Sequence, residues 1–336
     1  MSFFLRRIQL TGGSTYIVSL PKSWAEAANL KPGDYVQLIP QPDSTLLLIP
    51  RQKPGEQLEA RITATPENRP EELARELIAC YLAGYDVIRV GFMGDVDEFK
   101  PYLKNLMRAK LIGLESIEES ANHMLIRCLV GHVDFPIKEV LNRMHLMTLS
   151  MCRDALKALR EGDESLANDV VQRDDEVDRF YLFCVRQLKA AVENALLMRE
   201  LGLKSPRECL GYRLIIKSIE RIADHATSIA SQIPLVKARR NSPIMEGVIE
   251  LGGAALSIYE KAMESVFKMN LKQANRLILE VESLESLENG LVKRISESKL
   301  NMEAAVGLRL IVESLKRIAE YGADIAEIVI NLAIKS

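Results

Sequence analysis

The chain has 336 residues, 48% of them hydrophobic and 27% charged, a balance typical of folded soluble proteins and unlike that of disordered chains. Its net charge of −2 excludes a protein that is basic throughout, yet residues 1–53 carry +3 and the remainder carries −5, so we expect different partners for the two ends. The five cysteines show no CxxC spacing, which argues against a disulfide framework or a zinc finger. Without a signal peptide or an apolar run of about 18 residues, the sequence predicts a cytoplasmic protein with no membrane insertion.

The N-terminal segment, residues 1–53, is predicted to be a small β module. Turn signals such as Thr11–Ser14 separate short β-type runs, and Pro21 opens a short helix that continues to Ala28. The predicted strands are Arg6–Leu10, Tyr16–Leu20, Tyr35–Ile39 and Thr45–Ile49. A unit of this size buries little apolar surface, so we expect a partner subunit to complete its core.

Residues 56–133 mix strands and helices and predict a small α/β connector domain. The expected elements are strand Leu58–Ala64, helix Glu71–Ala83, strand Val87–Val90, helix Val96–Ala109, and strands Ile112–Ile117 and Met124–Val130. Neither this segment nor the rest of the chain contains a nucleophile elbow, a phosphate-binding loop or a dinucleotide-binding motif. We therefore predict that the protein is not an enzyme.

From Pro136 onward, apolar residues recur at three- and four-residue steps, which predicts helices through residues 136–336. This half contains an internal repeat, because Ser218–Asp224 matches Ser314–Glu320, 96 residues later.

Upstream, the repeat has a different spacing. Val177-Asp178 matches Leu284-Glu285, 107 residues later, and the difference of 11 residues predicts an extra loop near Leu201–Pro206 in the first copy. We therefore expect two three-helix bundles in tandem, residues 136–238 and 243–336.

Acidic residues at four-residue spacing stand beside the apolar stripes of the first copy. Asp174 and Asp178 lie one helical turn apart, as do Glu220 and Asp224. If the two helices pack side by side, four carboxylates converge, and such a cluster is unfavourable unless a cation neutralises it or protons are taken up. Oxygen ligands favour magnesium, manganese or iron over zinc. The candidate ligands of a divalent or trivalent metal ion are Asp174, Asp178, Glu220 and Asp224.

Two other interpretations stay open. Carboxylates beside an apolar stripe are typical of any solvated helical bundle, and Lys217 or Arg221 can pair with them. In the second copy, Lys316 replaces the equivalent of Glu220 and can itself serve as the counter-charge. A second, weaker metal site would use Glu282, Glu285, Glu320 and Asp324.

The segment Ser218–Ala230, SIERIADHATSIA, resembles the ERIGDHATNIAE signature of PhoU proteins, and the tandem three-helix arrangement is similar to theirs. The resemblance implies acidic helix motifs that bind metal clusters. It also implies negative regulation of phosphate uptake through transporter and signalling partners. With the α/β connector, the chain resembles archaeal PhoU-domain regulators.

The N-terminal segment resembles the AbrB/SpoVT swapped-hairpin family. The likeness rests on Arg6–Leu10, Ser19–Lys22 and Leu30–Val36, which follow the family order of strand, IPK, helix and LKxGDxV, whereas Gly12–Thr15 is unusual for it. Such modules form intertwined dimers whose paired strands present basic side chains to DNA. The resemblance implies a homodimer, and its candidate DNA contacts are Arg6, Arg7, Lys22 and Arg51.

The expected fold is therefore multi-domain and mostly α: a β swapped-hairpin module, a small α/β connector and tandem three-helix bundles. The predicted function is transcription regulation in phosphate homeostasis, with DNA bound by the β module. The helical half would sense metal or phosphate status, or contact a phosphate transporter or signalling protein. One alternative is an adaptor that inhibits a phosphate transporter without binding DNA. The other is a metal-dependent phosphohydrolase, for which the sequence offers no general acid and no phosphate cradle.

Overall fold

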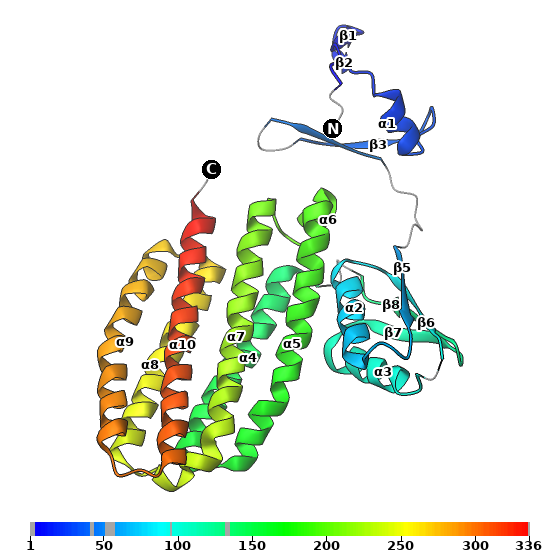
Figure 1. Cartoon of the computed structure of the whole chain (residues 1–336). Helices are drawn as coiled ribbons and strands as arrows, with labels where there is room; N and C mark the ends of the chain where they lie inside the picture. The colour runs from blue at the N-terminus through cyan, green and yellow to red at the C-terminus, as the bar shows by residue number, and fades with distance from the viewer. Residues whose placement is uncertain (1–3, 41–43, 51–57, 95, 132–134, 335–336) are drawn as a thin grey trace. The chain divides into compact units, whose positions relative to one another are not determined.

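The structure is a computed structural model that describes residues 4–40, 44–50, 58–94, 96–131 and 135–334. The chain forms two compact units, Met1–Gln57 and Leu58–Ser336, whose elements are labelled in Figure 1. The predicted fold class, a small β module followed by a mostly helical chain, is confirmed. Within the described ranges, no helix combines the length and the apolar character needed to span a membrane.

The first unit consists of two hairpins and a short helix. Its elements are β1 (Gln9–Thr11), β2 (Thr15–Ile17), α1 (Lys22–Ala27), β3 (Val36–Pro40) and β4 (Leu46–Pro50). β1 pairs antiparallel with β2, and β3 with β4. Gly12 and Gly13 connect the first two strands with φ angles of 62° and 77°, which glycine adopts without strain. Among the described residues of this unit, Ile39 alone is buried, so the unit has no core of its own.

The second unit begins with the α/β region, residues 58–131. Its elements are β5 (Glu59–Ala64), α2 (Pro70–Leu82), β6 (Val87–Phe92), α3 (Phe99–Lys110), β7 (Leu114–Glu119) and β8 (His123–Cys128). The four strands form one sheet in the order β5-β6-β8-β7, in which β5 and β6 are parallel and β8 is antiparallel to both of its neighbours. Leu77 of α2 and Leu103 of α3 pack in a core with Ile88 and Ile126 of the sheet. The α/β region therefore has a hydrophobic core of its own.

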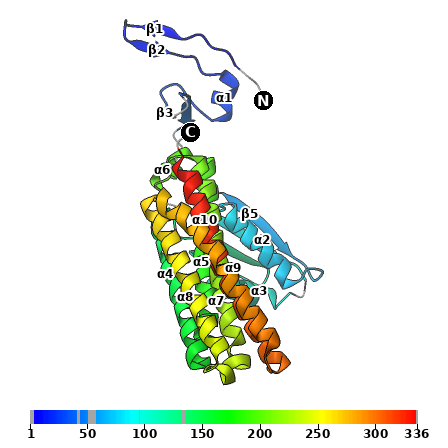
Figure 2. The ribbon, with the colours of Figure 1, turned by 90° about the vertical axis from the view of Figure 1, so that its left-hand side faces the viewer.

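The remainder of the second unit is helical. Its helices are α4 (Ile137–Glu161), α5 (Glu164–Glu193), α6 (Ala195–Glu200), α7 (Pro206–Val236), α8 (Pro243–Lys268), α9 (Leu271–Glu297) and α10 (Met302–Ala333), with a 3₁₀ turn at Lys237–Arg239. Side-chain caps fix several helix starts: the Asp163 carboxylate accepts from the N–H of Leu166, and the Asn301 side chain accepts from that of Ala304. Figures 1 and 2 show the long helices running alongside one another.

The helix order reproduces the internal repeat, since α4, α5 and α7 correspond to α8, α9 and α10. Ser205 and Asn301, 96 residues apart, cap α7 and α10 respectively. The extra residues of the first copy contain the short helix α6 in addition to the predicted loop at Leu201–Ser205. The prediction of a loop alone was incomplete, because a helix of 6 residues leaves too little periodicity to recognise.

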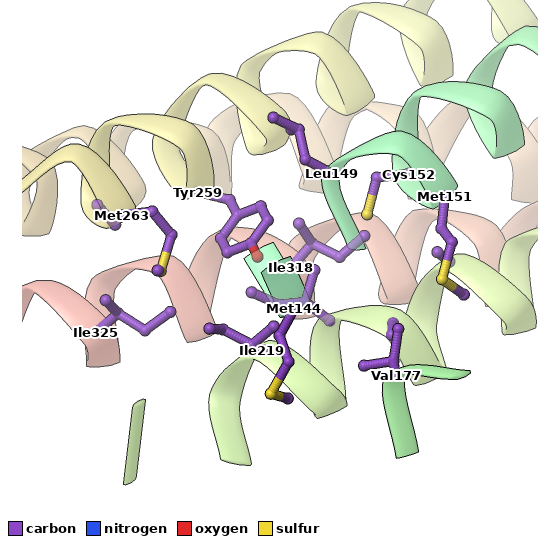
Figure 3. Close-up of a cluster of buried hydrophobic side chains, with 14 of the residues drawn as sticks. Met144, Leu149, Met151, Cys152, Val177, Ile219, Tyr259, Met263, Ile318 and Ile325 are labelled. Atoms are coloured by element: carbon purple, nitrogen blue, oxygen red, sulfur yellow. The ribbon is translucent and has the colours of Figure 1, made fainter. Parts of the chain in front are cut away.

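The two copies share one hydrophobic core. Figure 3 shows Met144 of α4, Val177 of α5, Ile219 of α7, Tyr259 of α8 and Ile318 of α10 in a single buried cluster. All five side chains are fully buried. The tandem bundles are therefore packed face to face, and neither copy closes its core without the other.

Two equivalent glycines bring α7 and α10 into close contact. A Cβ atom on Gly211 of α7 would lie 2.6 Å from the Leu332 side chain of α10, and one on Gly307 of α10 would lie 3.0 Å from the Val236 side chain of α7. Both pairs of positions are related by the 96-residue offset of the repeat. The helices therefore pack antiparallel and meet closely at both ends.

Arg186 of α5 holds the α/β region against the helices. Its side chain is 2% exposed, and its guanidinium donates to the carbonyls of Tyr81, Tyr85 and Gly84, at 3.2 Å for Tyr85 and 3.3 Å for Gly84. These carbonyls belong to the end of α2, where a helix leaves acceptors without partners. In Figure 1, α2 and α3 lie between the sheet and α5. The α/β region and the helices therefore form one unit.

Candidate functional site on the helical repeats

The four acidic residues of the first predicted metal site occupy adjacent helices. Asp174 and Asp178 lie on α5, while Glu220 and Asp224 lie on α7, which packs against α5. Val177, between the first two, points into the core. Three of the carboxylates are half-buried, and Glu220, which was predicted to lie beside the apolar stripe, is buried with 9% of its surface exposed.

Asp174 differs from the other three carboxylates, because within the described residues no hydrogen bond or ion pair holds it and Lys110 acts on it only through its charge. Burial, followed by the negative charges of Asp178 and Asp224, raises the pKa of Asp174 to about 6. Asp174 of α5 and Asp224 of α7 therefore lie close enough for their charges to interact.

Lys110, the last residue of α3, supplies a positive charge to this region from the α/β region. Its Nζ lies 2.7 Å from Oδ2 of Asp178 and 3.1 Å from Oδ1 of Asp175. Burial alone would lower the pKa of Lys110, but the hydrogen bonds to Asp178 and Asp175 together outweigh it and raise that pKa. The acidic face of α5 is therefore also a contact surface for the α/β region.

Glu220 is neutralised within its own helix. Nζ of Lys217 lies 2.7 Å and 2.6 Å from the two carboxylate oxygens of Glu220, and 5.0 Å from the centre of the Tyr181 ring. Burial raises the pKa of Glu220, although the Lys217 hydrogen bond opposes this. Asp224 is paired in a similar way with Arg221, whose guanidinium nitrogen lies 3.3 Å away.

In the second copy, a lysine stands where the first copy has a glutamate. Lys316, 96 residues after Glu220, lies 2.9 Å from Glu288 of α9 and 3.9 Å from Glu320. Arg309 approaches the same Glu288 carboxylate at 3.8 Å. The hydrogen bond to Glu288 raises the pKa of Lys316. The second copy thus also pairs a lysine with a buried glutamate, but its pair joins two helices, α10 and α9.

A cavity of about 280 Å³ lies beside this pair. Its charged lining residues are Glu282, Glu285, Glu288, Lys316 and Glu320. Three of the four acidic residues predicted for the second metal site are therefore together, whereas Asp324 does not line the cavity.

Glu288 was not singled out from the sequence, although a signal was present. It falls on the apolar stripe of α9, three residues before Leu291 and eleven after Leu277, both of which are buried. Its side chain is 7% exposed. A carboxylate at a core position of an amphipathic helix predicts a buried partner of opposite charge, and Lys316 is that partner.

The model of the PhoU domain family matches residues 141–233 and 248–329, which are the two helical repeats and together more than half of the chain. The chain belongs to the PhoU family. Among relatives, the phosphate-specific transport system accessory protein PhoU homolog of Clostridium acetobutylicum is 23% identical over 200 residues, 56% of this chain and 87% of that protein. PhoU homolog 1 of Thermotoga maritima is 22% identical over 214 residues, 61% of this chain and 90% of that protein.

Solved PhoU structures share the fold of the repeats. The crystal structure of PhoU from Pseudomonas aeruginosa superposes with a TM-score of 0.52 at 19% identity, covering 58% of this chain and 94% of that one. PhoU from Streptococcus pneumoniae superposes with a TM-score of 0.50 at 20% identity, covering 58% and 92%. The α/β region and the first unit lie outside the residues that match the PhoU family model.

The first unit matches a different family model. Residues 9–56 match the family model described as antidote-toxin recognition MazE, bacterial antitoxin. Of the predicted DNA contacts, Arg6 and Arg7 are exposed and precede β1, which begins three residues later than predicted. Lys22 opens α1 with its side chain 90% exposed and lies 3.7 Å from Glu26. Arg51 lies outside the described residues.

The carboxylates of this PhoU-family protein face the chain's own cations. In the part of the chain that the structure describes, no three His, Cys, Asp or Glu side chains are arranged to hold a metal ion. The oxygen donors suit a hard cation, but one that reaches Asp178 or Glu220 has to displace Lys110 or Lys217. The present arrangement therefore fits a metal poorly, and metal binding stays a prediction.

Proposed function

We propose that this PhoU-family protein is a dimeric cytoplasmic regulator of phosphate uptake and not an enzyme. The helical repeats receive a signal of phosphate or metal status, or contact a component of a phosphate transport system. The first unit binds DNA. The names of the relatives, accessory proteins of phosphate-specific transport, support the first part of the proposal. The match to an antitoxin family supports the second.

The lack of a core in the first unit is the observation that carries the proposal of a dimer. Large apolar side chains on and beside its strands are open to solvent, among them Leu10 at 57%, Tyr16 at 76% and Leu38 at 55% exposed. A unit of this size with that surface is not stable in water by itself. A second copy that interleaves its strands would bury these residues, as the resemblance to swapped hairpins implies.

The charge of the first unit supports contact with DNA. Its basic residues include the exposed Arg6 and Arg7 at the start of the first hairpin. A charge of +3 for each copy doubles to about +6 in a dimer, enough for a salt-sensitive hold on phosphates. The rest of the chain carries a net charge of −5, so DNA would be held by the first unit alone.

DNA binding is tested by fluorescence anisotropy with promoter DNA, starting at about 50 mM salt. The intact protein is expected to bind, and log affinity should fall linearly with log salt concentration. Arg6→Ala/Arg7→Ala should weaken binding and reduce the slope by about 0.9 for each DNA phosphate that the variant no longer neutralises. Lys272→Ala/Arg276→Ala, which removes the same charge from α9, is the matched control.

Two results of this experiment would contradict DNA binding. One is no binding at low salt, and the other is equal affinity for the variant and the control. Either would favour an adaptor that dimerises through the first unit and acts on a phosphate transporter.

The proposed metal site uses three of the four predicted ligands. Asp174, Asp178 and Asp224 would hold a hard cation such as iron, manganese or magnesium, and Lys110 would have to leave Asp178. Elemental analysis of the purified protein tests this directly. Metal in a stoichiometric amount, lost on Asp174→Asn/Asp224→Asn, would support it. Protein that stays metal-free after incubation with each ion and gel filtration would contradict it.

A further inference from the structure

A second cavity, of about 530 Å³, lies where the α/β region meets α4 and α5, away from the carboxylates described above. Ile112, two residues after α3, forms one wall, and the other lining residues come from α4, from α5 and from Phe135, two residues before α4. In Figure 1, α2 and α3 lie beside α5. The volume falls within the range of small-molecule sites.

Three phenylalanines form the apolar part of the lining. Phe135 and Phe183 meet edge to face, with ring centroids 6.1 Å apart and planes at 79°. The Phe135 carbonyl accepts a 2.8 Å hydrogen bond from the Gln187 side-chain amide, which fixes the chain next to the cavity. Phe180 is the third ring. Aromatic rings grouped in this way suit a flat ring, which they contact through faces and edges.

Two arginines form the cationic part. The guanidinium of Arg143 lies over the Phe180 ring, 4.8 Å from its centroid. The Nε of Arg179 is buried and has no hydrogen-bond partner. Among the described residues, no carboxylate lies within ion-pair distance of either guanidinium, although Glu139 and Glu176 line the same cavity. A buried guanidinium N–H without an acceptor is unfavourable, and an anion in the cavity would supply one.

We propose that this cavity binds a nucleoside phosphate. The base lies among the phenylalanine rings, where stacking is favourable for any base. The phosphate accepts from Arg143 and Arg179, whose planar guanidinium groups match its oxygens. The carboxylates of Glu139 and Glu176 accept from the ribose hydroxyls. Inorganic phosphate alone would leave the aromatic part of the cavity unfilled and would gain little from a lining with two acidic and two basic residues.

The position of the cavity gives the ligand a regulatory role. The bound nucleotide would touch both the α/β region, through Ile112, and the helices, through Phe180. Lys110, two residues before Ile112, holds the α/β region on Asp178. Occupancy is therefore coupled to the docking of the α/β region on α5. The inference does not depend on the DNA proposal, because binding is measured on the protein alone.

The test is isothermal titration calorimetry of the intact protein with AMP, ADP and ATP in metal-free buffer, with inorganic phosphate and adenosine as comparison ligands. At least one nucleotide should bind at a single site with a Kd below about 1 mM, at least about tenfold tighter than either comparison ligand. Arg179→Met should weaken binding by about tenfold or more, as should Phe180→Leu by stacking loss. Arg276→Met on α9 should leave it unchanged.

Three results would overturn the proposal that the cavity binds a nucleoside phosphate. No saturable binding of any nucleotide up to about 1 mM would overturn the proposal. So would equal affinity for inorganic phosphate, or unchanged affinity in a folded Arg179→Met protein. Circular dichroism of each variant establishes whether it is folded. If Arg179→Met does not fold, the nucleotide affinity of Phe180→Leu decides.

Discussion

His225 of α7 and Tyr321 of α10 occupy equivalent positions in the two repeats, 96 residues apart, and their rings lie against each other with centroids 5.9 Å apart and planes at 32°. Arg153 and Glu260, equivalent at the upstream offset of 107 residues, form an ion pair at 2.9 Å. Equivalent residues touch only where an approximate twofold axis passes between them. The two repeats are thus related by such an axis, which explains why they share one core.

Two helix glycines in different surroundings provide the first prediction. Gly211→Ala should destabilise the protein by about 1–3 kcal/mol, because the added Cβ would lie 2.6 Å from Leu332. Gly253→Ala on α8, with no neighbour within 4 Å, should instead stabilise by up to about 1 kcal/mol through helix propensity. Urea unfolding compares the two. A Gly211→Ala protein as stable as Gly253→Ala would contradict the close packing of α7 on α10.

The second prediction concerns the buried charge of the second repeat. Lys316→Met should cost about 1–3 kcal/mol, because it leaves the Glu288 carboxylate buried with only the more distant Arg309. The double variant Glu288→Leu/Lys316→Met should recover most of the loss, since an apolar pair replaces the ion pair on the apolar stripe of α9. Urea unfolding measures both. A double variant that is less stable than Lys316→Met would mean that Lys316 does not stabilise the protein by pairing with Glu288.

A third prediction concerns Arg186. Arg186→Met removes the donors that bind the carbonyls of Tyr81, Gly84 and Tyr85, and the loss of a fully buried, hydrogen-bonded charge should cost about 3 kcal/mol. The α/β region has a core of its own and should stay folded. Hydrogen exchange should therefore increase mainly where α2 and α3 face α5. Unchanged exchange along that surface would show that Arg186 does not hold the two regions together.

The fourth prediction is a pH dependence set by His145. This residue is 7% exposed, lies edge to face with Tyr259 at 5.1 Å, and burial lowers its pKa from 6.5 to about 4. In the unfolded chain the imidazole takes up a proton near pH 6.5, whereas in the folded protein it stays neutral to about pH 4. The contribution to stability is thus complete above pH 6.5 and is lost as the pH falls toward 4.

His145→Leu should remove this dependence. Between pH 7 and pH 5, the native protein should lose on the order of 2 kcal/mol more stability than the variant does. Urea unfolding at both pH values gives the difference. Parallel pH profiles for the two proteins would mean that burial does not shift the pKa of His145.

Much of the helical half could be predicted from the sequence, because a 3.6-residue period and a repeat constrain which faces are buried. The adjacency of Asp174 and Asp178 to Asp224 followed from that register. Lys110 could not be foreseen as their counter-ion, since it lies 68 residues before Asp178 and reaches it from a different element. Glu288 was overlooked because charged residues on a helix are read as solvent-facing, although its position on the stripe indicated burial.

The cavity beside Phe180 could not be predicted from the sequence either. Its lining comes from α4, α5, Ile112 and Phe135, and no local spacing connects Arg143 with Arg179. The first unit was predicted well in the order of its elements, since turn residues mark its boundaries. The strand starts were displaced by a few residues, because short exposed strands carry little alternation.

The proposed dimer requires that the first unit lacks a complete hydrophobic core without a second copy. Sedimentation equilibrium of the intact chain at about 1 μM, compared with Leu10→Asp/Leu38→Asp, measures this directly. We predict a mass of twice 37.7 kDa for the intact chain and a shift toward 37.7 kDa for the variant. An intact chain that sediments at 37.7 kDa with its first unit folded would contradict the account.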